Sequence, residues 1–252
     1  MEKINQLMQE WQKGTIKLSS ELNSKGYKKD LLKKYIKSKW LESLGYGAFK
    51  LAGDNVEWFG AIHALQEEKN FSLHPGGKTA LTIKGYAHYL SERLGDIQLF
   101  GNSTENLPRW FVKQQWNVKI KYIQTKLFGE DTRKYLSNAE IKNVKIKISS
   151  PEIAAMEMLH LVPKDQSFDE ATKIMDGLTT LRPKLVQELL EKCNSIKVKR
   201  LFMFMAEKSQ HLWLKDLASE KVNLGSGKRS VVKNGVLDKK YQITVPKEFA
   251  ES

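Results

Sequence analysis

The chain has 252 residues, 40% of them hydrophobic and 10% aromatic, so it can bury a core in one large domain or two and is not wholly disordered. The formal net charge is +13, and so basic a sequence favours a polyanionic partner, nucleic acid ahead of an anionic membrane surface. The single cysteine, Cys193, excludes an internal disulfide and a multi-cysteine zinc site. Without an apolar leader or an apolar run of membrane-spanning length, we expect a cytoplasmic protein with no membrane partner.

The first predicted elements are two short helices, over residues 4–12 and 18–24. Apolar residues at helical spacing mark the first helix, and Gly14 ends it. Ser19 or Ser20 is the expected N-cap of the second helix, and Gly26 supplies the turn that follows it. This order predicts a helix-turn-helix once the next helix begins at residue 28.

The third predicted helix, residues 28–39, is apolar on one side and basic on the other. An arc of about 140° holds its apolar residues, Leu31, Leu32, Tyr35 and Ile36. Lysines fill the opposite side, with only Asp30 among them. A lysine face is usually only solvated, but this one lies between a glycine turn and a predicted hairpin, residues 40–51, with its tip at Gly45-Tyr46-Gly47. The combination indicates a winged helix-turn-helix that binds DNA.

Duplex DNA would contact the basic helix, the segment before it and the wing. Our candidate contacts are Lys17, Ser19, Tyr27, Lys28, Lys29, Asp30, Lys33, Lys34, Lys37, Tyr46 and Lys78. Lysine acts mostly as a point charge on phosphates, so sequence specificity would come from a few residues of this set, from the wing or from DNA shape. The few residues are Tyr27, Lys29, Asp30 and Lys33.

Lys78 belongs to a glycine-rich turn, Gly76-Gly77-Lys78-Thr79, that superficially resembles the end of a nucleotide-binding phosphate loop. The turn lacks the upstream glycine and the apolar strand of such a loop, so we do not expect nucleotide binding. A turn before a helix that starts near Thr79 explains it better. Its backbone amides could also hold a DNA phosphate, which is why Lys78 is a candidate.

Between about residues 96 and 106 the sequence changes to a strand-like segment followed by a polar loop, and we place a domain boundary near residues 90–100. This gives a winged helix-turn-helix domain at residues 1–95 and a second domain at residues 96–252. Strands are predicted over residues 97–101, 118–123 and 144–148, the last two by alternation of apolar residues with lysine. Helices are predicted from Ser150-Pro151 onward and over residues 168–178, 184–193 and 199–207, followed by a hairpin within residues 231–245. The expected fold class is therefore α+β, with a winged helix-turn-helix followed by a mixed α/β domain.

Catalytic and metal-binding patterns are weak, and we expect no enzyme activity, no metal and no cofactor. None of the five histidines forms a ligand pair, and Cys193 is best interpreted as a small buried apolar residue. Leu224-Gly225-Ser226-Gly227 has the wrong spacing for a serine nucleophile; before Lys228 and Arg229 it is either an anion-contacting loop or an ordinary turn. A nuclease is a less favoured alternative, because the strand lysines Lys145 and Lys147 do not complete the acid-x-lysine order of such sites.

Several strings along the chain are characteristic of one known family. In the N-terminal half they are SKWLESLGYGAF (residues 38–49), WFGAIHALQ (58–66), HPGGKTAL (74–81) and GYAHYL (85–90). In the C-terminal half they are SPE (150–152), LTTLRP (178–183), VKRLF (198–202), LGSGKR (224–229) and YQITVP (241–246). Through these strings the whole chain resembles the AbiEi family, the antitoxin and regulator half of type IV toxin–antitoxin systems.

The resemblance implies two roles. The N-terminal domain would bind inverted repeats in the promoter of its own operon and repress it. The C-terminal domain would counter a nucleotidyltransferase-like toxin without forming a stable complex with it. A basic surface formed by Arg182, Lys199, Arg200, Lys228 and Arg229 could serve this second role or hold another polyanion. The alternative is a free-standing DNA-binding regulator with a C-terminal interaction module.

Overall fold

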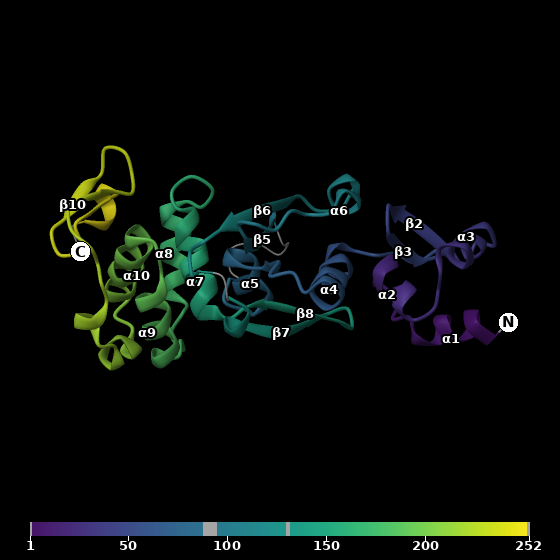
Figure 1. The fold of residues 1–252 in the computed structure, drawn as a ribbon. Helices are drawn as coiled ribbons and strands as arrows, with labels where there is room; N and C mark the ends of the chain where they lie inside the picture. The colour runs from purple at the N-terminus through teal and green to yellow at the C-terminus, as the bar shows by residue number, and fades with distance from the viewer. Residues whose placement is uncertain (1, 88–94, 130–131, 251–252) are drawn as a thin grey trace.

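The computed structural model describes residues 2–87, 95–129 and 132–250, which form an elongated molecule with the two termini at opposite ends (Figure 1). The N-terminal end consists of three helices and a small antiparallel sheet of strand order β1-β3-β2. Their bounds are α1 Glu2–Glu10, β1 Lys17–Leu18, α2 Ser19–Ser24, α3 Lys29–Lys37, β2 Leu41–Gly45 and β3 Ala48–Leu51. The three helices and the hairpin follow one another as the sequence predicts, whereas β1, which pairs with β3, is not predicted.

The turn between α2 and α3 is tight because Gly26 adopts a positive φ of 84°, a region that glycine enters without steric cost. The amide of Tyr27 then donates to the carbonyl of Leu22 at 2.8 Å. A small hydrophobic core lies between the helices and the hairpin. Its buried residues are Leu7, Trp11, Leu22, Tyr27, Leu32, Tyr35, Leu41 and Leu51. The predicted serine cap of α2 is wrong: Leu18 occupies the N-cap position, and no side chain caps the helix.

The middle of the molecule is built on two sheets. The first has the order β4-β5-β6, with β4 antiparallel and β6 parallel to β5, and the second is the hairpin of β7 and β8. The bounds are α4 Trp58–Lys69, β4 His74–Pro75, α5 Gly77–Ile83, β5 Ile97–Asn102, α6 Arg109–Lys113, β6 Ile120–Thr125, β7 Leu136–Ile141 and β8 Val144–Ser149. Strand β7 was not predicted, because its sequence, LSNAEI, has too few apolar residues for a clear alternation.

Residues on the two sides of the predicted domain boundary pack together. Helix α4 lies on β8, α5 packs against β5 and against α7 (Pro151–Leu161), and β4 pairs with β5. The Gln66 side chain on α4 exchanges hydrogen bonds of 2.8 Å with the backbone of Lys147 on β8. The boundary between residues 95 and 96 stays a prediction, and in space residues 58–83 share a core with the strands that follow it.

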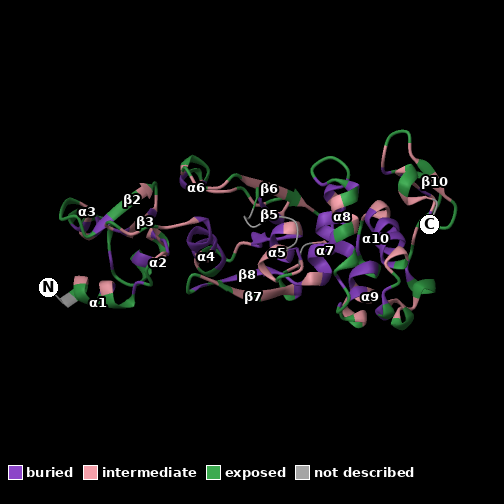
Figure 2. Ribbon diagram, turned by 180° about the vertical axis from the view of Figure 1, so that it is seen from behind, coloured by how far each residue is buried: buried purple, intermediate pink, exposed green. Residues whose placement is uncertain are grey.

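The C-terminal end holds the remaining helices and a small sheet of order β10-β11-β9 (Figure 1). The bounds are α7 Pro151–Leu161, α8 Phe168–Asp176, α9 Pro183–Lys192, α10 Ile196–Lys208, β9 Arg229–Ser230, β10 Val236–Asp238 and β11 Ile243–Val245. Figure 2 shows α7 buried along most of its length, which explains why it is apolar nearly all round. The mixed fold is confirmed. The hairpin predicted within residues 231–245 consists of β10 and β11, which are antiparallel and reverse between Asp238 and Ile243.

A buried polar cluster joins the middle sheet to α7. Both ring nitrogens of His74 have acceptors: Nδ1 faces the carbonyl of Ser72 at 2.5 Å, and Nε2 faces Glu157 Oε1 at 3.0 Å. Glu157 Oε2 accepts from the amide of Gly77 and the hydroxyl of Ser149. Burial lowers the pKa of His74, but the Glu157 carboxylate more than compensates, so the pKa is raised. The HPGG string therefore has a structural role here.

Candidate nucleic-acid interface

Helix α3 presents the lysine face that its sequence predicts. Leu32 and Tyr35 are buried against the N-terminal core. The exposed side consists of Lys28, just before the helix, and of Lys29, Asp30, Lys33, Lys34 and Lys37. Asp30 is the single carboxylate in this set, and it lies 3.6 Å from Lys33 Nζ. The face is therefore strongly positive and accessible to a polyanion.

The hairpin of β2 and β3 forms the predicted wing beside α3. Tyr46 at its tip is fully exposed, at 100% of its accessible surface. The flanking glycines allow the reversal, with φ of 139° at Gly45 and 78° at Gly47. The amide of Ser19 donates to the carbonyl of Gly47 at 2.8 Å, so the start of α2 is tied to the wing tip. Ser19 therefore lies where the wing and the helix pair meet.

A groove of about 310 Å³ separates α3 from the wing. Among the predicted residues, Lys29, Lys33, Ser19 and Tyr46 line it, whereas Lys28, Lys34 and Lys37 lie outside it. The lining also includes two polar residues that the sequence analysis missed, Asn23 on α2 and Ser43 on β2. An asparagine amide can donate to and accept from an adenine edge. The sequence does not identify Asn23, because the angle between α2 and α3 decides which side of α2 faces the groove.

Three of the predicted DNA contacts are engaged inside the protein. Tyr27 is 4% exposed, packs in the N-terminal core and donates its hydroxyl to the carbonyl of Lys3, so it has no free face for a base. Lys17 bonds the carboxylates of Glu21 and Glu68, at 2.9 and 3.5 Å. Lys78 lies in α5, away from the N-terminal end, and forms an ion pair with Glu170 on α8. Burial therefore argues against Tyr27 as a base contact, and Lys17 and Lys78 are already paired with carboxylates.

The predicted C-terminal basic surface does not form from its five residues. Arg200 is 3% exposed, and its guanidinium donates to the carbonyls of Leu224, Gly225, Gly227 and Gln242. Lys199 is also buried and donates to the carbonyl of Asn223. The loop around Ser226 therefore turns carbonyls toward a buried cation, the opposite of an anion-binding loop. Lys228 and Arg229 in the loop are exposed, as is Arg182, which pairs with a carboxylate.

Arg182, the fifth residue, lies at the start of α9 and belongs to an ion pair. Its guanidinium donates to both oxygens of the buried Glu152 carboxylate on α7, at 2.8 and 3.0 Å. Burial raises the pKa of Glu152, but the bonds from Arg182 outweigh it, so the pKa is lowered. Arg182, which belongs to the LTTLRP string, therefore links the start of α9 to α7 through this ion pair.

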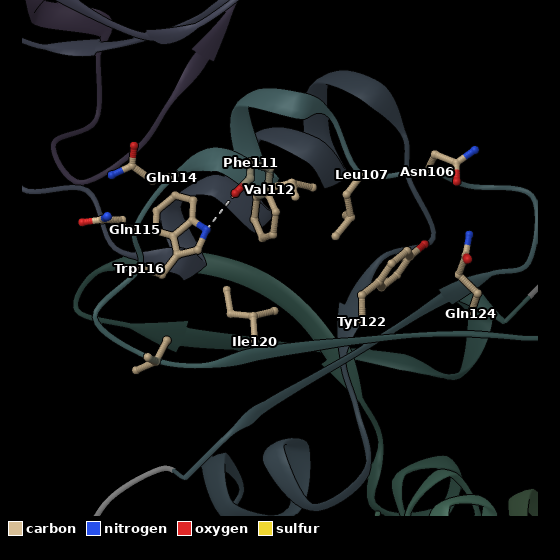
Figure 3. A pocket seen from close by; sticks show the side chains of 11 residues that line it. Asn106, Leu107, Phe111, Val112, Gln114, Gln115, Trp116, Ile120, Tyr122 and Gln124 are labelled. Carbon is tan, nitrogen blue, oxygen red and sulfur yellow. Dashed lines mark hydrogen bonds between the residues drawn. The ribbon is translucent and has the colours of Figure 1, made fainter.

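A second groove, of about 680 Å³, lies between α6 and β6 (Figure 3). Its apolar lining includes Phe111, Trp116 and Tyr122, and the Trp116 indole donates to the carbonyl of Phe111 at 3.0 Å. Its polar lining consists of amide side chains and the Tyr122 hydroxyl, which donates to the carbonyl of Glu105. Among the described residues, no carboxylate lines this groove.

Other chemistry has little support in the described part of the chain. Residues 2–87, 95–129 and 132–250 contain no group of three or more His, Cys, Asp or Glu that could hold a metal ion. Cys193 is buried as predicted, and burial raises the pKa of its thiol to about 11. Among these same ranges, no helix has the length and apolarity to cross a bilayer.

Comparison with known proteins identifies the two halves. Residues 1–92 match a family described as the N-terminal domain of the AbiEi antitoxin, a transcriptional regulator. Residues 95–246 match a family described as the AbiEi antitoxin and transcriptional regulator of a type IV toxin–antitoxin system. No match was found among curated proteins. The crystal structure of the RV2827C protein from Mycobacterium tuberculosis is similar in fold, with a TM-score of 0.63 at 11% identity over 95% of this chain and 88% of that chain.

Proposed function

Because the chain belongs to the AbiEi family of antitoxins and transcriptional regulators of type IV toxin–antitoxin systems, we propose that its N-terminal end represses its own operon by occupying promoter DNA. Helix α3 enters the major groove, and the wing around Tyr46 contacts the adjacent minor groove or backbone. The observation that carries this proposal is the lysine face of α3, exposed beside an exposed wing tip. Inverted repeats in the promoter would bring two copies to neighbouring half-sites.

We propose that base reading belongs to the residues that line the groove between α3 and the wing. Lys29 and Lys33 on α3 and Asn23 on α2 line it together. Lysine can donate to the O6 and N7 of guanine, and asparagine can pair with the N6 and N7 of adenine. Lys28, Lys34 and Lys37 lie outside the lining and are assigned to phosphates.

The test compares Lys29→Glu/Lys33→Glu with a charge-matched control, Lys164→Glu/Lys184→Glu, on duplex DNA from upstream of the gene. The control residues are exposed in the C-terminal end of the molecule. The first variant should lose about a hundredfold or more in affinity, and the wild type should weaken steeply with salt, because each phosphate contact releases counterions. Fluorescence anisotropy across a salt series measures both effects. Unchanged affinity of the first variant, with its fold intact by circular dichroism, would contradict the assignment of α3.

For the rest of the chain, we propose antitoxin activity against a nucleotidyltransferase-like toxin, without a stable complex and without catalysis. The family description of residues 95–246 supports the antitoxin role. We place the protein in the cytoplasm, where it would encounter both promoter DNA and the toxin. The surface of five cations predicted for this role is replaced by Lys228 and Arg229. Lys199 and Arg200 are buried and bond backbone carbonyls, and the exposed Arg182 is paired with Glu152.

A further inference from the structure

Helix α6 belongs to the middle of the molecule but touches the wing. A Cβ atom placed on Gly45 would lie 2.9 Å from the Cβ of Trp110 on α6, so the two backbones approach as closely as glycine permits. Trp110 and Phe111 are buried, and their rings meet edge to face, which anchors α6. Figures 1 and 2, which view the molecule from opposite sides, both show α3, β2 and α6 along one edge. This edge of the molecule therefore extends from α3 and β2 at the N-terminal end to α6 in the middle part.

This continuation is basic. Arg109 and Lys113 are exposed at both ends of α6 and, four residues apart, lie on one face of the helix. Neither forms an ion pair with any residue in the described ranges of the chain. The surrounding sequence, residues 106–129, contains no aspartate or glutamate.

Two other cations in the middle of the molecule are paired with carboxylates. Lys121 on the neighbouring strand β6 bonds Asp96 and Asp165, and Lys134 bonds Glu188. A pair of cations left without carboxylates, beside a wing that faces DNA, has the character of a phosphate-binding site.

We propose that Arg109 and Lys113 form a second DNA contact, which clamps the phosphate backbone of the duplex beyond the wing. This inference rests on the proposed function and extends it from the N-terminal end to α6. Because the contact reaches only phosphates, it carries no base specificity. It increases affinity, lengthens the footprint on one side and adds about two units to the slope of log affinity against log salt, at about 0.9 per phosphate.

The test uses duplexes from upstream of the gene, shortened in steps from either end. For the wild type, trimming one end should weaken binding about tenfold before the contacts of α3 are reached, since two phosphate contacts are lost. Arg109→Glu/Lys113→Glu should bind the long duplex about as weakly as the wild type binds the trimmed one, with a smaller salt slope and no further loss on trimming. The control Lys164→Glu/Lys184→Glu should follow the wild type.

A second variant, Arg109→Gln/Lys113→Gln, removes the charges while it keeps long polar side chains, and thermal unfolding verifies its fold. It should reproduce the loss on the long duplex to a smaller extent. If both α6 variants bind the long duplex with wild-type affinity and salt slope while Lys29→Glu/Lys33→Glu does not bind, the clamp is wrong and the role of α3 stands. If the wild type binds no duplex, the proposed function fails and the clamp with it.

Discussion

At the scale of single residues, the junction of α2 and α4 holds two carboxyls side by side. Burial and the neighbouring Glu21 carboxylate raise the pKa of Glu68 to about 8. Burial also raises the pKa of Glu21, but hydrogen bonds with Glu68, Lys25 and Lys17 outweigh it and lower the pKa to about 2. With both groups ionised, Glu21 Oε2 is buried without a hydrogen-bond partner. A proton on Glu68 supplies the missing donor, so near neutral pH the pair holds one proton.

This pair makes the stability of the fold depend on pH. The folded pKa of Glu68 lies above its unfolded value of 4.5, so its contribution to stability is complete below pH 4.5 and is lost as the pH rises through 8. The contribution of Glu21 is present above pH 4.5 and is lost as the pH falls through 2. Between about pH 5 and 8, the folded chain therefore binds one more proton at this pair, and the free energy of unfolding decreases as the pH rises.

Glu68→Gln should remove this dependence, because an amide can donate to Glu21 and accept from the Leu18 amide without a proton. Urea unfolding at several pH values between about 5 and 8 should give a flatter profile than that of the wild type and a higher free energy of unfolding at the upper end. Glu67→Gln, at the exposed neighbouring position, is the control and should keep the wild-type slope. An unaltered slope in Glu68→Gln would mean that the carboxyls do not share a proton.

Residue roles are predictable from the sequence when periodicity decides burial. The lysines of α3 were placed correctly because apolar residues at helical spacing fix which side of the helix faces the core. Lys199 and Arg200 were misplaced because their partners are backbone carbonyls 24 to 42 residues later in the chain. Carbonyls carry no side-chain signature, so no sequence pattern separates such a cation from a solvated one.

At the scale of elements, Arg200 fixes the small C-terminal sheet to α10. Its guanidinium makes four hydrogen bonds, of 2.6 to 3.1 Å, to loop carbonyls before β9 and before β11. Burial lowers the pKa of the group, as expected for a cation that carbonyls alone satisfy. The sheet itself has strands of only two or three residues, so this anchor supplies much of its order.

Arg200→Met should destabilise the chain by about 3 kcal/mol or more, because the loop carbonyls lose a charged donor. Protease cleavage within residues 223–242 should become faster, and thermal unfolding should begin at a lower temperature. Lys228→Met, in the same loop but exposed, should change neither measurement. Equal protease resistance in the two variants would show that the sheet does not depend on the guanidinium. DNA binding should persist in both.

The elements best predicted from the sequence are those with local signals. Glycines with positive φ mark the turn at Gly26 and the wing tip, and Pro151 and Pro183 begin α7 and α9. The contact between the wing and α6 has no such signal, because it joins residues 65 positions apart through a glycine that also serves the hairpin. The second DNA contact could therefore be inferred only from the structure.

At the scale of the whole molecule, the N-terminal half is not one unit in space. The strand pairing of β4 with β5, the packing of α5 on α7 and the buried His74–Glu157 pair tie residues 58–83 to the C-terminal half. The winged part up to β3 has its own small core and meets the rest mainly along α4 and α6. A cut near residue 55 therefore severs fewer interactions than a cut near residue 100.

A fragment of residues 56–252 should fold and, expressed beside the toxin, restore growth without binding promoter DNA. A fragment of residues 100–252 should not fold, because it exposes the apolar faces that α4 and α5 cover and leaves the buried Glu157 without His74, a loss of about 3–5 kcal/mol for the pair alone. Circular dichroism and thermal unfolding test the folding of each fragment, and growth of cells that express the toxin tests its activity. Should the longer fragment fold and yet fail to restore growth, antitoxicity would need the DNA-binding end, and the division of roles proposed for this chain would be wrong.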